Sequence, residues 1–152
     1  MRLFDDECYW MKIKDGDPRG LRLYEKHYSK YHYKDGRRPK RFVGPGQRIV
    51  LLGKNDDALF VWRKFRSMDN QEGINCAVFR NESSVLSSEL LLQAEAIAME
   101  RWPGERMYTY VNPKEVKSVN PGYCFKVIGW SVIGKTKARK LLILEKTYQN
   151  GN

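Results

Sequence analysis

Residues 120–130 read NPGYCFKVIGW, and this pattern predicts a short helical segment followed directly by a strand. We expect the stretch 121–127 to form a short helix or turn that ends at Gly129. Apolar residues then predict a strand at 130–133, and a second strand at 141–145 closes a hairpin around a basic loop.

The elements upstream of this motif follow from hydrophobic periodicity. Residues 106–111 alternate and predict a strand, whereas residues 86–101 carry apolar side chains at helical spacing. Serines precede that helix and Pro103-Gly104 stops it. Earlier in the chain, short β-rich runs predict three more strands, at 48–53, 58–62 and 74–79.

The first third of the chain is more basic and less regular. We expect a short helix at 20–33 and a loop at 34–47, where glycine and proline are frequent. The order strands, helix, strand, short helix, strands predicts one α/β (α+β) domain over residues 1–152, with a mixed sheet and helices on both faces. Residues 1–47 would be its basic N-terminal region and 48–146 its core.

Over roughly residues 58–146, this pattern resembles the GNAT N-acyltransferase superfamily. Its members often show an asparagine, a short helix and then Gly-Phe opening a strand; Asn120, Gly129 and Trp130 take these positions here. Residues 108–112 resemble the strand that splays away from its neighbour in that fold, and strand 74–79 would be the neighbour.

The resemblance implies acetyl-CoA or another acyl-CoA as cofactor, bound between strands 74–79 and 107–111. Its pyrophosphate would lie at the start of helix 86–101, where backbone N–H groups and the helix dipole attract anions. The implied cofactor-binding residues are Phe79, Arg80, Ser83, Ser84, Ser87, Ser88, Asn112, Asn120 and Phe125.

Two positions depart from the pattern of that family. The phosphate loop would read Arg80-x-x-Ser83-x-Val85, without the usual glycines, and an ordinary serine-capped helix explains the same letters. Phe125 stands where the family frequently has a general-acid tyrosine, so another residue must donate that proton or no acyl transfer occurs.

The catalytic candidates are one histidine and two tyrosines. His27-Tyr28-Ser29 resembles a segment of phage Mom-type proteins, which modify DNA bases on this fold. A neutral His27 could accept the proton that an attacking amine releases. Tyr108 and Tyr110 are candidate donors to the CoA thiolate. A surface or capping role for His27 and a core role for both tyrosines are equally consistent with the sequence.

The formal net charge of +10 favours a polyanionic partner such as DNA or a nucleotide. The candidate nucleic-acid-binding residues are Arg37, Arg38, Lys40, Arg41, Arg63 and Lys64. A basic protein without such a partner is the alternative.

Other features limit the function classes. Three widely spaced cysteines predict neither a disulfide framework nor a zinc site, and we expect no metal and a cytoplasmic location. No apolar run reaches the length of a membrane span. The oligomeric state is left open.

Together these features predict an acyl-CoA-dependent N-acyltransferase acting on an amine of a nucleobase or nucleotide, in phage DNA modification. Two alternatives remain: a GNAT-like protein that binds nucleic acid without catalysis, and a GNAT enzyme that acetylates a protein or a small amine. Titration with CoA and with DNA distinguishes these three hypotheses.

Overall fold

One seven-stranded sheet organises the computed structural model, which describes residues 8–27, 40–65, 71–114 and 120–148. Its order is β1-β2-β3-β4-β5-β7-β6, and all neighbours are antiparallel except β4 and β5, which are parallel. The predicted mixed sheet is therefore confirmed. The strands are β1 (Trp10–Ile13), β2 (Gln47–Gly53), β3 (Ala58–Lys64), β4 (Ile74–Asn81), β5 (Met107–Val111), β6 (Ser131–Lys135) and β7 (Leu142–Lys146).

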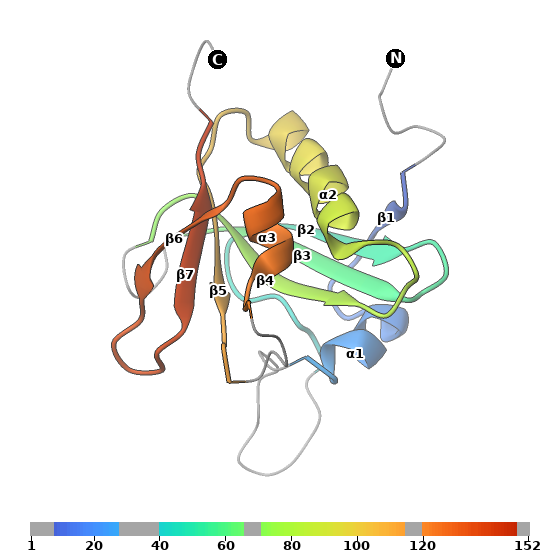
Figure 1. Ribbon diagram of the computed structural model, residues 1–152. Coiled ribbons are helices and arrows are strands. Elements are labelled where there is room, and N and C mark those ends of the chain that lie inside the picture. The colour runs from blue at the N-terminus through green and yellow to red at the C-terminus, as the bar shows by residue number, and fades with distance from the viewer. Residues whose placement is uncertain (1–7, 28–39, 66–70, 115–119, 149–152) are drawn as a thin grey trace.

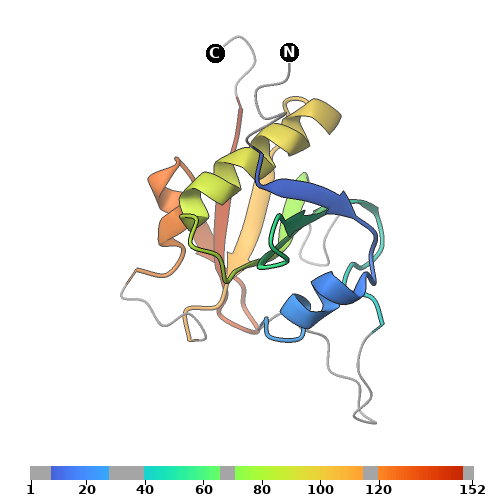
Figure 2. The same ribbon diagram turned by 90° about the vertical axis from the view of Figure 1, so that its right-hand side faces the viewer.

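Helices cover both faces of this sheet, as predicted. α2 (Ser87–Arg101) and α3 (Tyr123–Val127) lie on one face, and α1 (Pro18–Tyr24) lies on the other (Figures 1 and 2). Within the described residues, no helix is both long enough and apolar enough to span a membrane.

β3 shows why two helical layers are needed. Its side chains alternate between the faces, and both sets are buried. Phe60 and Trp62 join the core under α2, whereas Leu59 and Val61 join the core under α1. The Trp62 indole also donates a hydrogen bond to the Ala94 carbonyl of α2 at 2.9 Å, which ties the helix to the centre of the sheet.

The N-terminal region differs from the prediction at two points. The helix expected at 20–33 is α1, which begins at Pro18 and ends at Tyr24, so His27 lies in the turn beyond it. Asp17 caps this helix by accepting a hydrogen bond from the Arg19 amide, and Pro18 occupies the first turn, where its missing N–H costs nothing.

β1 was not predicted at all. It has only four residues, and Trp10 alone among them is buried, so its sequence carries no alternation to detect. Its pairing with β2 places it at the edge of the sheet.

Candidate functional site

The site begins where β4 and β5 stop pairing. Their parallel register joins Ile74 to Met107 and ends at the pair Cys76–Thr109, although β4 continues to Asn81 and β5 to Val111. The Thr109 hydroxyl donates a hydrogen bond to the Cys76 carbonyl at 2.9 Å and so closes the last paired position. The strands are thus adjacent and then diverge, as predicted.

A β-bulge marks the same point on the other edge of β4. Val61 of β3 lies opposite Val78 and Trp62 lies opposite Cys76, so Ala77 is an extra residue in β4. A bulge bends its strand and increases the local twist. The bulge therefore lies at the level where β4 and β5 stop pairing.

A cavity of about 450 Å³ lies at this gap. Its lining comes from β4, β5, the start of α2, the segment around α3, and the turn that follows α1. Ala77 packs with the core on the α1 face, whereas Phe79 and Phe125 pack on the α2 face, so the cavity reaches both sides of the sheet. Its volume is in the range of cofactor pockets.

The start of α2 offers backbone donors to this cavity. The N-cap residue is Leu86, which is 72% exposed and makes no capping hydrogen bond with its side chain. Ser87 and Ser88 follow at the positive end of the helix dipole, and both line the cavity. The alternative of a serine-capped helix is therefore wrong.

Asn81 holds the loop before α2 in shape. Its amide group donates to the Val85 carbonyl at 2.7 Å and to the Ser87 hydroxyl at 3.0 Å, and its oxygen accepts from the Ser83 amide at 2.8 Å. The sequence analysis did not identify Asn81, because its role depends on a loop conformation that no periodic pattern encodes. Asn81 thus connects the end of β4 to the start of α2.

The structure brings only part of the expected cofactor set together. Phe79, Ser87, Ser88, Asn120 and Phe125 line the cavity. The other four expected cofactor residues lie outside this lining. Three of them make contacts elsewhere: Arg80 pairs with Glu82 at 3.0 Å, Ser83 bonds to Asn81, and Asn112 accepts a hydrogen bond from the Lys114 amide. The fourth, Ser84, is exposed.

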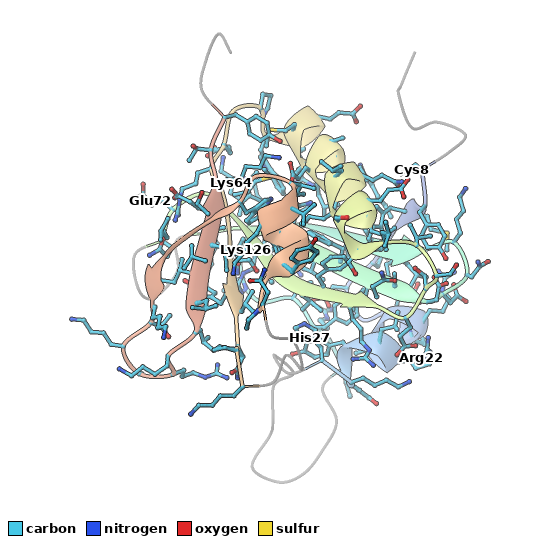
Figure 3. The ribbon with its side chains drawn as sticks, in the orientation of Figure 1. Cys8, Arg22, His27, Lys64, Glu72 and Lys126 are labelled. Carbon is cyan, nitrogen blue, oxygen red and sulfur yellow. The ribbon has the colours of Figure 1, made fainter. Side chains whose placement is uncertain are left out.

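His27 also lines the cavity, from the turn after α1 (Figure 3). Its pKa is lowered to about 4: burial is the largest cause, the nearby Arg80 charge acts in the same direction, and a hydrogen bond with the Phe79 backbone partly offsets both. The imidazole is therefore neutral at pH 7 and able to accept a proton.

The shifted pKa of His27 predicts a pH dependence of stability. Between pH 6.5 and 4, His27 binds a proton in the unfolded chain but not in the folded chain. The free energy of unfolding should therefore fall as the pH falls. The loss attributable to His27 is on the order of 3 kcal/mol. Urea unfolding at pH 7, 5.5 and 4 should show this loss in the wild type and a shallower pH slope in His27→Gln. Equal slopes would contradict the buried, neutral imidazole.

The two expected tyrosines occupy different positions. Tyr110 lines the cavity, whereas Tyr108 is fully buried behind it, with the two ring centroids 5.8 Å apart. Tyr123 also lines the cavity and is 60% exposed, and the sequence analysis missed it. Its position two residues before Phe125, inside the 120–130 motif, was the available signal.

Four of the six expected nucleic-acid-binding residues lie in the part of the chain that the structure describes. Arg37 and Arg38 lie outside the described residues, and Lys40 and Arg41 are exposed. Arg63 and Lys64 are neighbours in β3 and point to opposite faces; Lys64 pairs with Glu105 at 2.6 Å. The side chains of Arg63 and Lys64 therefore lie on different sides of the sheet.

Comparison with known proteins shows the fold. No protein-family model and no curated protein sequence matches this chain. Among solved structures, the crystal structure of ElaA from Escherichia coli is similar, with a TM-score of 0.57 and 14% sequence identity. The match covers 90% of this chain and 98% of that chain. At the level of fold, the chain is a single GNAT-like α+β domain.

Proposed function

We propose that this chain is an acyl-CoA-dependent N-acyltransferase whose acyl-CoA site is the cavity between β4 and β5. The observation that carries the proposal is the end of β4–β5 pairing at Cys76–Thr109, directly beside that cavity and the uncapped start of α2. A pantetheine arm is long and narrow, and its pyrophosphate is anionic. The gap between β4 and β5 suits the pantetheine arm, and the N-terminus of α2 suits the anionic pyrophosphate.

We assign the catalytic tasks to groups in or beside the cavity. Acyl-CoA supplies an activated carbonyl carbon, and the amides of Ser87 and Ser88 would hold its pyrophosphate. A backbone N–H of β4 beyond Cys76 would stabilise the charge that develops on the carbonyl oxygen. His27 would accept the amine proton, and Tyr110 or Tyr123 would donate a proton to the departing sulfur.

We propose a nucleobase or nucleotide amine as acceptor, in the modification of phage DNA. The net charge of +10 supports this choice, as do exposed cations at Lys40 and Arg41 and in the loop between β6 and β7. Phosphate contacts release counterions, so binding to DNA should weaken steeply as salt increases.

The cofactor site is tested by a matched pair of variants at Ser87. Leu86 has φ −59° and ψ 135°, which are compatible with a following proline, and Ser87 is the first residue of α2. Ser87→Pro thus removes one N–H donor together with the hydroxyl that accepts from Asn81, while α2 is kept, and Ser87→Ala removes the hydroxyl alone. We expect the proline variant to bind acetyl-CoA roughly 10–100-fold more weakly, the value of one hydrogen bond to a charged group.

In the same calorimetric titrations, Ser87→Ala should bind within a few-fold of the wild type. Circular dichroism and thermal unfolding serve as the folding control for both variants. If Ser87→Pro folds and binds acetyl-CoA as the wild type does, the pyrophosphate does not lie at the start of α2.

A further inference from the structure

A row of polar side chains crosses the sheet on its α1 face. Arg63 of β3 pairs in register with Asn75 of β4, which pairs with Tyr108 of β5. Val61 and Leu59, which alternate with Arg63, pack in the core under α1, and this places the row on that face. The row thus places polar side chains beside the apolar core under α1.

One side-chain atom of Asn75 and one of Arg63 are buried and have no hydrogen-bond partner among the described residues. Asn75 is 5% exposed, and its side-chain oxygen accepts no hydrogen bond from any described residue. The Arg63 Nε–H is likewise buried and finds no acceptor in the described part of the chain. Such atoms are rare in folded proteins, because each costs the free energy of an unmade hydrogen bond.

Three cations near Arg63 differ from it because each has a carboxylate partner. Arg48 pairs with Asp15 at 3.2 Å, Lys64 with Glu105 at 2.6 Å and Arg106 with Glu145 at 2.6 Å. Arg63 has no such carboxylate among the described residues, although burial lowers its pKa by disfavouring its charge. An anion beside Arg63 would therefore stabilise it.

The guanidinium of Arg63 is held in place. It stacks on the Phe65 ring, 4.4 Å from the centroid, and it lies against Gly44, where a Cβ would collide with its Nη1. A side chain fixed in this way loses little entropy when it binds a ligand.

This row borders the proposed acyl-CoA site. Asn75 immediately precedes Cys76, which lines the cavity, and the Tyr108 ring contacts the Tyr110 ring, which also lines it. The cavity reaches this face of the sheet at His27 and Ala77. A molecule bound on the row would thus lie on the α1 side of the gap.

We propose that Arg63 and Asn75 bind the acceptor, and that this acceptor is an amine bearing an oxyanion, either a carboxylate or a phosphate. The oxyanion accepts from Arg63, and an N–H of the acceptor donates to the Asn75 oxygen. This inference rests on the proposed function, since it assigns the second substrate of the same site.

Calorimetric titration with two pairs of probes tests this site. The pairs are dAMP with deoxyadenosine, and L-lysine with L-lysinamide; each pair differs by the presence of the anion. In at least one pair, the probe that carries the oxyanion, here called the anionic probe, should bind the wild type on the order of 10–100-fold more tightly than the probe that lacks it. The dAMP pair reports a phosphate and the lysine pair a carboxylate.

Variants assign the binding to Arg63. Arg63→Gln should abolish the difference in affinity between the two probes of a pair, and Arg63→Lys should restore part of this difference. Gly44→Ala should reduce the difference in affinity, because it displaces the guanidinium. Lys54→Gln, at an exposed site in the turn between β2 and β3, is the control of equal charge and should change nothing. The proposal is wrong if neither anionic probe binds, or if both Arg63→Gln and Gly44→Ala bind as the wild type does.

The two proposals fail separately. Binding of acetyl-CoA without binding of any anionic probe contradicts the acceptor site alone. Binding of an anionic probe through Arg63 without binding of acetyl-CoA contradicts the transferase and leaves an anion site.

Discussion

Replacing His27 with alanine is expected to lower the rate of acyl transfer by about 10²–10⁴-fold, the usual contribution of a general base. His27 lines the cavity and is neutral at pH 7, so it can accept a proton without first losing one. Steady-state CoA release, followed with acetyl-CoA and dAMP, measures the change.

The affinity for acetyl-CoA should stay within a few-fold in this variant, because no proposed cofactor contact uses the imidazole. The wild-type profile of kcat/KM should fall on the acid side near pH 4, where His27 becomes protonated. Lys26→Ala, which changes an exposed neighbour, is the control. Full activity in His27→Ala would assign the proton acceptor to water or to another residue.

Replacing Glu95 with alanine is expected to lower the free energy of unfolding by about 3–5 kcal/mol, the cost of removing one partner from a buried ion pair. Glu95 is 2% exposed, and its carboxylate is 2.7 Å from the Lys146 ammonium. It also accepts hydrogen bonds from the Trp130 indole and the Tyr148 hydroxyl, each at 2.8 Å.

This carboxylate links α2 to β7 and to the end of the α3 segment, since Lys146 also donates to the Ile128 carbonyl at 2.9 Å. Its loss should therefore loosen the side of the cavity that α3 forms. Glu100→Ala, at an exposed position of the same helix, should change stability by less than about 0.5 kcal/mol. Chemical denaturation measures both variants, and equal stabilities would show that the network contributes nothing.

The core elements were predictable because their sequences carry clear periods. The apolar positions of α2 recur at helical spacing, and β3 is a continuous apolar run, so both were placed within a few residues. The short helix predicted within residues 120–130 is confirmed as α3. Gly122 adopts φ 80° before this helix and Gly129 adopts φ 100° after it, and such conformations favour glycine.

The site was less predictable, because its geometry depends on tertiary contacts. Ser87 and Ser88 could be expected from a helix that follows a strand. Asn81 could not, since its role appears only when the loop folds around it. The predicted strand ended at residue 62, whereas β3 continues to Lys64, so the opposite directions of Arg63 and Lys64 were not expected.

Calorimetric titration of the wild-type protein with acetyl-CoA tests the central claim most directly, with double-stranded DNA titrated separately. The cavity between β4 and β5 predicts saturable binding of one acetyl-CoA per chain, with competition by free CoA. Saturable binding of DNA in the absence of any binding of acetyl-CoA would contradict the acyltransferase and leave a GNAT-like nucleic-acid-binding protein.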